Sequence, residues 1–182
     1  MKIPLNAKKV FDGIIFDVYQ WEQEMFNGTK ETFEMLKRPN TIEVIATEGN
    51  KILLSKQSQP NKADFYSLFG GRAEEGEEPL VTAKRELLEE SGLKSDDWEL
   101  LKTYTPMHKI DWNIYMYVAR NCTKTSEQKL DAGEKIEIIK CTFDEFIKIV
   151  ESDNYWGNDL VLDVLRMKQS NKLEEFRKKI FG

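Results

Sequence analysis

Cysteine and histidine are scarce in this chain of 182 residues, which has two cysteines and one histidine. Cys122 and Cys141 are too few and too isolated to build a disulfide framework or a thiolate zinc site, so we expect reduced, partly buried thiols. Because His108 is the single histidine, most Ser-His and Cys-His catalytic schemes are excluded.

Long apolar runs and a positive net charge are also missing. No apolar stretch is long enough to cross a bilayer, so we expect no membrane partner. Residues 1–9, MKIPLNAKK, lack the apolar stretch of a secretory signal, and the expected location is therefore the cytoplasm. The formal net charge of −5 argues against a nucleic acid partner, because binding to its phosphates needs a basic face.

Hydrophobic periodicity and turn residues predict a mixture of strands and helices. Strands are expected at 13–26, 32–37, 41–47, 51–55, 65–69, 98–104, 112–119 and 136–141. Helices are expected between Pro79 and Gly92 and at 143–151, 158–168 and 171–181. These elements predict an α/β or α+β domain with a mixed sheet, and no Pro/Gly-rich linker separates parts of the chain.

The most informative segment is 71–93, GRAEEGEEPLVTAKRELLEESGL, which has the spacing G-x5-E-x7-R-E-L-x-E-E-x-G-L. From average residue usage, the chance of this pattern at a given position is on the order of 10⁻⁸ or less, so accident is a poor explanation. The fixed positions are Gly71, Glu77, Arg85, Glu86, Leu87, Glu89, Glu90, Gly92 and Leu93.

This spacing places Glu86, Glu89 and Glu90 on one side of a helix, because residues three and four apart are neighbours there. Such crowded carboxylates destabilise a bare helix and raise one another's pKa values. A divalent cation offsets this repulsion, and Mg²⁺ bound to a few carboxylates also acidifies a coordinated water. The alternative is a solvated acidic face, with Glu77 and Arg85 forming an ion pair that braces the loop.

The segment resembles the signature of the Nudix hydrolases, which use Mg²⁺ and water to cleave a nucleoside diphosphate linked to another group. The resemblance implies a Nudix fold, in which a mixed β-sheet is sandwiched between helices, with an N-terminal antiparallel β-extension. It also implies a cation site for Mg²⁺, with Mn²⁺ as a substitute. The implied metal ligands are the Gly70 carbonyl, Glu86, Glu89, Glu90 and Glu134, and the implied structural residues are Gly71, Glu77, Arg85 and Gly92.

Two further stretches resemble the ADP-ribose pyrophosphatase subfamily. Residues 11–34 are similar to its β-extension, which helps form a homodimer and part of the adenosine pocket. The implied division is an extension at 1–40 and a Nudix domain at 41–182. Residues 129–138 resemble the acidic catalytic loop of these enzymes, with Glu134 as the best match. The general base stays open between Glu134, Glu89 and Asp131.

The expected contacts to substrate are weaker. Trp21 is a candidate for stacking on a purine, although an aromatic residue in an apolar strand is more often core or dimer interface. Arg72 follows the glycine pair and is a candidate for contact with a phosphate, although exposed loop arginines are usually solvated. Pro106 is a candidate because it lies near the position of a proline that these enzymes carry downstream of segment 71–93, a little closer to that segment than usual. Gln57 and Gln59 lie where many of them place a substrate-binding arginine.

The resemblance favours a Mg²⁺-dependent hydrolase that splits ADP-ribose into AMP and ribose 5-phosphate. One alternative is a Nudix hydrolase of another small nucleotide: a sugar nucleotide, a dinucleotide or a nucleoside triphosphate. Another is a non-catalytic nucleotide sensor, which predicts an eroded acidic cluster. Because Glu86, Glu89 and Glu90 are all present, catalysis is favoured.

Overall fold

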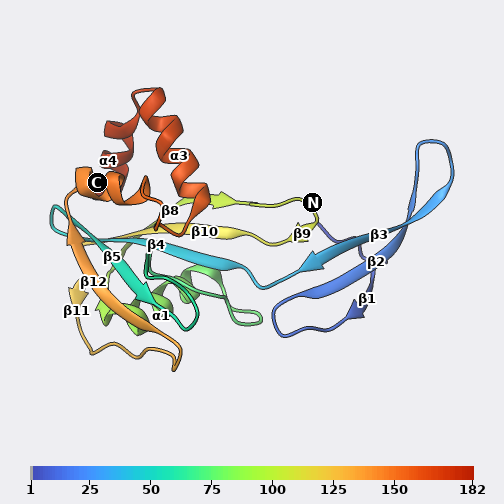
Figure 1. Ribbon diagram of the computed structural model, residues 1–182, viewed down its shortest axis with the longest axis horizontal. Helices are drawn as coiled ribbons and strands as arrows, with labels where there is room; N and C mark the ends of the chain where they lie inside the picture. Colours follow the sequence, from blue (N-terminus) through green and yellow to red (C-terminus); the bar gives the residue numbers. More distant parts are fainter. Residues whose placement is uncertain (1) are drawn as a thin grey trace.

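A computed structural model describes residues 2–182, and this part of the chain folds into twelve strands and four helices (Figure 1). The strands are β1 (Lys8–Phe11), β2 (Asp17–Glu24), β3 (Lys30–Lys37), β4 (Thr41–Glu48), β5 (Lys51–Ser58), β6 (Phe65–Ser67), β7 (Leu93–Lys94), β8 (Asp97–Tyr104), β9 (Ile110–Asp111), β10 (Ile114–Arg120), β11 (Thr123–Lys124) and β12 (Lys135–Cys141). The helices are α1 (Pro79–Ser91), α2 (Phe143–Val150), α3 (Asn158–Gln169) and α4 (Leu173–Phe181).

The main sheet is mixed and has six strands, in the order β12–β5–β4–β10–β8 with β6 paired to β5. β4 and β10 are parallel, whereas the other pairs are antiparallel. Helix α1 covers one face, and α2, α3 and α4 cover the other (Figure 1). This arrangement confirms the expected mixed sheet between helices.

Strand β4 shows why the sheet is covered on both sides. Ile42, Val44 and Ala46 are fully buried and pack with the core under α1, whereas Ile45 is fully buried in the core on the other face. Successive side chains of a strand point to opposite faces, so a strand that is apolar on both faces needs a cover on each. β4 is therefore a central strand, and it passes directly beneath the glycine pair at 70–71.

A second sheet lies to one side of the main sheet, with the order β1–β2–β3–β9 (Figure 1). The strand predicted at 13–26 begins only at Asp17, because the carbonyl of Phe16 packs against Gly13 in a tight turn. β1 and β9 were not predicted, and neither were β7 and β11, which pair with each other. The strand predicted at 112–119 is observed as β10, which starts at Ile114, and residues 110–111 before it pair with β3 as the separate strand β9.

The other predicted elements are confirmed to within a few residues. Helix α1 begins at Pro79 and ends before Gly92, whose φ of +71° and N–H bond to the Leu88 carbonyl form the predicted left-handed end. Cys122 and Cys141 are free and buried, as expected. Within residues 2–182 no helix is long and apolar enough to span a membrane.

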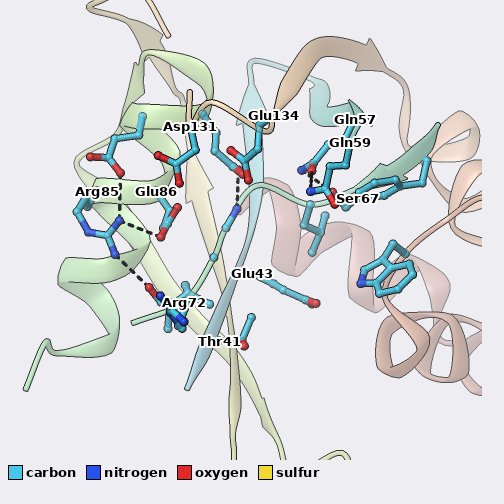
Figure 2. A pocket seen from close by; sticks show the side chains of 18 of the residues that line it. Thr41, Glu43, Gln57, Gln59, Ser67, Arg72, Arg85, Glu86, Asp131 and Glu134 are labelled. Carbon is cyan, nitrogen blue, oxygen red and sulfur yellow. Dashed lines mark hydrogen bonds and ion pairs between the residues drawn. The ribbon is translucent and has the colours of Figure 1, made fainter. Parts of the chain in front are cut away.

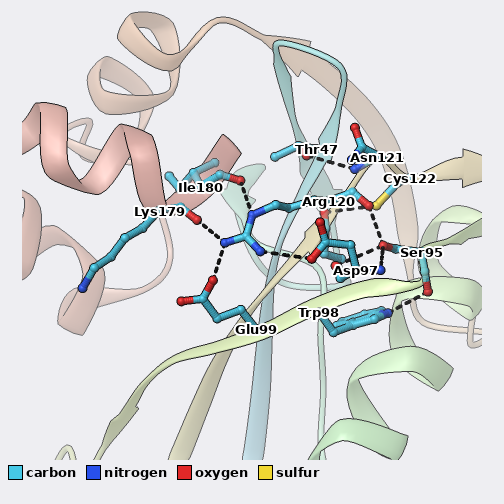
Figure 3. Close-up of polar contacts among 11 residues, drawn as sticks. Thr47, Ser95, Asp97, Trp98, Glu99, Arg120, Asn121, Cys122, Lys179 and Ile180 are labelled. Carbon is cyan, nitrogen blue, oxygen red and sulfur yellow. Dashed lines mark hydrogen bonds and ion pairs between the residues drawn. The ribbon is translucent and has the colours of Figure 1, made fainter. Parts of the chain in front are cut away.

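Helix α4 is fixed to the sheet by one buried arginine. Arg120 of β10, only 8% exposed, donates to the carbonyls of Lys179 and Ile180 and to the carboxylates of Asp97 and Glu99 on β8 (Figure 3). Charge-assisted hydrogen bonds of this kind are stronger than neutral ones. The end of the chain is thus held against the main sheet, on the face opposite α1.

Candidate active site

The turn after β6 brings backbone very close to β4. Gly70 has a φ of +143°, and a Cβ added there would meet the Ile42 carbonyl oxygen at 2.0 Å. At Gly71 an added Cβ would lie 2.7–2.8 Å from the carboxyl atoms of Glu86. Only glycine fits both positions without displacement of its neighbours. The carboxyl group of Glu86 therefore rests directly on the turn.

The three acidic residues of α1 face this turn to different depths. Glu90 is 5% exposed and accepts a hydrogen bond of 2.8 Å from the N–H of Gly70. The side chain of Glu86 is 14% exposed and that of Glu89 is 37% exposed. Helix α1 thus presents one buried, one half-buried and one accessible carboxylate along a single wall.

Burial, together with repulsion from neighbouring acids, raises the pKa values of Glu90 and Glu86. Burial raises the pKa of Glu90 to about 8, and repulsion from Glu86, Glu134 and Glu89 adds to the effect. Burial likewise raises the pKa of Glu86, with further repulsion from Glu89 and Glu134. The pKa of Glu134 is raised by burial and by Asp131. The 129–138 loop therefore lies close enough to α1 for its acids to share one electrostatic environment.

Arg85 links this wall to the preceding loop. Its guanidinium contacts both carboxyl oxygens of Glu77 at 3.0–3.1 Å, Glu86 at 2.9 Å and Glu89 at 3.0 Å. It also donates to the carbonyl of Arg72 at 3.2 Å. The expected ion pair between Glu77 and Arg85 is thus present, and the same arginine neutralises part of the acidic wall.

The acidic wall borders an open cavity of about 830 Å³ (Figure 2). Its other borders come from β3–β4, β5, β6, the 129–138 loop and the loop between α2 and α3. The polar and aromatic residues around it include Arg38, Thr41, Glu43, Gln57, Gln59, Lys62, Phe65, Ser67, Arg72, Lys129, Asp131, Glu134 and Trp156. Acidic, basic and aromatic groups therefore face one space, which has room for a nucleotide.

Comparison with known proteins identifies the family. The model of the NUDIX domain family matches residues 37–161. The chain belongs to the Nudix family. It is 31% identical over 152 residues to the ADP-ribose pyrophosphatase of Bacillus subtilis (strain 168), covering 81% of this chain and 82% of that protein. It is 28% identical over 174 residues to the methanol dehydrogenase activator of Bacillus methanolicus, covering 93% and 94% of the two chains.

A solved structure described as an ADP compounds hydrolase superposes with a TM-score of 0.71 at 18% identity. The match covers 92% of this chain and 95% of that one. At this identity the likeness shows a shared fold, and it includes both the extension and the main sheet of this Nudix protein.

Nudix hydrolases generally need a divalent cation, and the oxygen donors of this site fit one. Within residues 2–182 no three acidic, histidine or cysteine side chains lie close enough together to hold a metal ion as they stand, and Arg85 contacts two of the carboxylates, Glu86 and Glu89. In the described chain the carbonyl of Gly70 accepts no hydrogen bond, although its N–H is bound to Glu90. Carboxylates that suffer from burial and mutual repulsion, beside a free carbonyl, are suitable ligands for a hard cation.

The structure brings some predicted site residues together and separates others. Arg72, Asp131 and Glu134 line the cavity with the acidic wall. Trp21 and Pro106 do not line it in the single chain. Trp21 lies in β2 at 9% exposure, with its ring 6.0 Å from that of Phe33, so its role and that of Pro106 stay predictions.

Sequence reasoning missed two groups of cavity residues. Arg38 directly follows β3 and lines the cavity, and its Nη2 contacts Thr41 Oγ1 at 3.4 Å. Lys62 places its Nζ 3.6 Å from the ring centre of Phe65 and 3.4 Å from that of Trp156, which comes from the α2–α3 loop. None of these positions belongs to a local motif. They can be recognised as cavity residues only from the folded structure.

The Glu77–Arg85 contact predicts a pH-dependent stability. Hydrogen bonds from Arg85 lower the pKa of Glu77 from 4.5 to about 2. A carboxylate with a lowered pKa stabilises the fold above pH 4.5, and this contribution is lost as the pH falls toward 2. We expect Glu77→Gln to lower the urea midpoint at pH 7, and the difference from the wild type to shrink below pH 4.5.

The matched control is Glu75→Gln, because Glu75 is an exposed residue of the same loop. This control should keep the wild-type midpoint at each pH. A Glu77→Gln midpoint equal to that of the wild type at pH 7 would show that the ion pair does not brace the loop.

Proposed function

We propose that this Nudix protein hydrolyses the diphosphate linkage of a nucleoside diphosphate derivative, with ADP-ribose as the expected substrate. The products would be AMP and ribose 5-phosphate. The observation that carries the proposal is the buried carboxylate of Glu90, set beside Glu86 on the Gly70–Gly71 turn at the wall of an 830 Å³ cavity. The similarity to an ADP-ribose pyrophosphatase supports the choice of substrate.

The proposed cation is Mg²⁺, with Mn²⁺ as a substitute. Its ligands would be the Gly70 carbonyl, Glu86, Glu89, Glu90 and Glu134. When bound, the cation would neutralise charge on the diphosphate and acidify a water molecule. The N–H of Gly70 orients Glu90, and the glycine turn keeps side chains away from the space above Glu86.

A general base must lie within reach of the attacking water. The three candidates, Glu134, Glu89 and Asp131, all line the cavity. Burial and Asp131 raise the pKa of Glu134, which makes its carboxylate a stronger base. We therefore favour Glu134 and keep Glu89 and Asp131 as alternatives.

Two alternative functions can be tested by experiment. One is the hydrolysis of a different nucleotide, such as a sugar nucleotide, a dinucleotide or a nucleoside triphosphate. The other is a regulatory role without catalysis, which the name of the Bacillus methanolicus relative brings into consideration. The intact acidic wall favours catalysis, because a sensor has no need to keep repelling carboxylates buried.

We also propose an N-terminal extension at 1–40 and a Nudix domain at 41–182, in a cytoplasmic protein with no nucleic acid partner. The second sheet supports this division, since β1, β2 and β3 all precede residue 40. The net charge of −5 supports the absence of a nucleic acid partner. The exposed apolar residues of the extension support a homodimer. They are Leu5, Val10, Phe11, Ile14, Ile15, Phe16 and Phe26.

The function is tested by a panel of ADP-ribose, sugar nucleotides, dinucleotides and nucleoside triphosphates, each with Mg²⁺ and with EDTA. We expect metal-dependent hydrolysis, fastest with ADP-ribose. Glu90→Gln should lower kcat/KM at least about 100-fold, because losing even an outer partner of a metal ligand costs 10–100-fold. Its thermal midpoint should equal or exceed that of the wild type, since an uncharged side chain is easier to bury.

The matched control is Glu127→Gln, whose carboxylate is 96% exposed, and its activity should be normal. Near-normal activity of Glu90→Gln would contradict the metal assignment. No hydrolysis of any compound in the panel would favour the regulatory role.

The homodimer is tested by light scattering after size-exclusion chromatography. Charges on fully exposed apolar residues of the extension should prevent its burial against a second copy. We expect twice the 21.3 kDa chain mass for the wild type, and a monomer for the double variant Ile14→Glu/Phe26→Glu. The control Leu162→Glu, on exposed α3 surface, should stay dimeric. A wild-type monomer would refute the dimer.

A further inference from the structure

A lysine side chain lies between two aromatic rings at the border of the cavity. The Nζ of Lys62 is 3.6 Å from the ring centre of Phe65 and 3.4 Å from that of Trp156. The face of an aromatic ring carries partial negative charge, so it attracts a cation placed over it. The rings of Phe65 and Trp156 thus form an aromatic notch that holds an alkylammonium group.

Backbone hydrogen bonds build the aromatic notch. The N–H of Trp156 donates to the carbonyl of Tyr66 at 2.7 Å, and the N–H of Tyr66 donates to the carbonyl of Asn154 at 2.9 Å. These bonds fix the α2–α3 loop beside β6, the strand that carries Phe65. Phe65 is 7% exposed, whereas Trp156 is 61% exposed. One ring is therefore the buried base of the notch, and the other is accessible to a ligand.

Lys62 is held without an acidic partner. In residues 2–182 no carboxylate lies within 4.0 Å of its Nζ, whereas the Nζ atoms of Lys9 and Lys168 each have one. The nearest acid in the sequence, Asp64, accepts a hydrogen bond from Ser58 at 2.7 Å. Burial lowers the pKa of Lys62, because its ammonium loses water without gaining a carboxylate. Attraction to the two rings is therefore what retains this charge in the notch.

The shape of the aromatic notch suits a rounded cation and not a flat base. The two ring centres are 5.8 Å apart, and the ring planes are inclined at 51°. A base between two rings needs parallel faces about 7 Å apart, twice the contact distance of about 3.5 Å between carbon atoms. The inclined rings instead open as a wedge, in which a larger cation has room further out than the Lys62 ammonium.

Lys62 competes with any ligand for the aromatic notch. Because it is tethered beside the rings, its effective concentration there is high, and a free cation binds poorly while it is in place. A ligand that is held elsewhere in the same cavity is tethered too and competes on equal terms. The primary ammonium of lysine is strongly hydrated, whereas a quaternary ammonium has no N–H group and gives up less hydration. Exchange of the lysine for a quaternary ammonium is therefore favoured.

The aromatic notch lies across the cavity from the acidic wall. Phe65 pairs with Gln57 in the β5–β6 ladder, and Figure 2 shows Gln57 on the opposite side of the cavity from Arg85 and Glu86. These residues all line the same cavity. A ligand whose phosphates lie at the acidic wall therefore has space to direct its other end toward the notch.

We propose that the aromatic notch is a subsite for a quaternary ammonium group, which displaces Lys62 from Phe65 and Trp156. The subsite widens the substrate class of the proposed function, on which this part rests, to nucleoside diphosphates joined to a quaternary amino alcohol such as choline. Lys62 is then a residue that determines specificity, because it closes the notch to groups that bind the rings less strongly than its own ammonium.

The direct test is a choline titration in EDTA, without turnover, in which saturation-transfer NMR of the choline methyl protons gives Kd. Lys62→Ala should bind choline at least about 10-fold more tightly than the wild type, because the tethered competitor is gone. The neutral analogue of choline, with a tert-butyl group in place of trimethylammonium, should bind this variant at least about 3-fold more weakly than choline, because it lacks the cation–π attraction.

Two further variants locate the binding. Lys62→Ala/Trp156→Leu should lose the gain, and its fold should persist because Trp156 is largely exposed. The matched control Lys94→Ala changes an exposed lysine of β7 outside the cavity and should bind choline as the wild type does. Equal choline affinity in Lys62→Ala and the wild type, or no loss in the double variant, would overturn the subsite. Equal affinity for choline and its neutral analogue would show that apolar contact alone retains the ligand, against the proposal.

Activity tests the substrate class separately. Choline and glucose derivatives of the same nucleoside diphosphate are compared with Mg²⁺. We expect Lys62→Ala to raise the ratio of kcat/KM for the choline compound to that for the glucose compound at least about 3-fold over the wild type. Hydrolysis of ADP-ribose without hydrolysis of the choline compound would overturn the substrate class while the proposed function stands. If no compound is hydrolysed, the proposed function fails and the titrations in EDTA still decide the notch.

Discussion

The burial of Glu90 against the N–H of Gly70 is the constraint on which the rest of the site depends. The contact fixes α1 to the glycine turn. This turn can lie against β4 and the Glu86 carboxyl only because Gly70 and Gly71 have no side chains. It also places a carboxylate where burial and neighbouring acids raise its pKa to about 8. A fold stabilised only by packing has no use for such a group, so the arrangement is best explained by a bound cation.

Charges in the cavity are segregated. One wall carries Glu86, Glu89 and Glu90, partly neutralised by Arg85. The end formed by Arg38 and Arg72 has positive charge without an acidic partner in the described residues. A diphosphate with a cation is complementary to both parts, because the cation suits the acids and the phosphoryl oxygens suit the guanidiniums.

Local sequence patterns predicted the parts of the fold that local physics determines. The β4–β5 hairpin, helix α1 from Pro79 to the left-handed Gly92, and the later helices all follow from periodicity and turn residues. The short strands β1, β7, β9 and β11 were missed, since their pairing depends on tertiary contacts.

The candidate site likewise has one part that the sequence predicts and another that only the fold brings together. The acidic wall lies within one contiguous segment, and its spacing was sufficient to predict it. Arg38 and Trp156 are separated by more than a hundred residues in the sequence and meet the cavity only through the packing of β3–β4 and the α2–α3 loop. Trp21, predicted from its type and position, packs on Phe33 in the extension instead of facing the cavity of its own chain.

The most direct test of the central claim is a crystal structure with Mn²⁺ and a non-hydrolysable nucleotide diphosphate, with data collected at the Mn absorption edge. We predict anomalous density between the carboxylates of Glu86 and Glu90 and the carbonyl of Gly70, with a phosphoryl oxygen on the same ion. If the nucleotide is bound, no anomalous density lies among these residues, and Glu90 still faces only the N–H of Gly70, the account is contradicted.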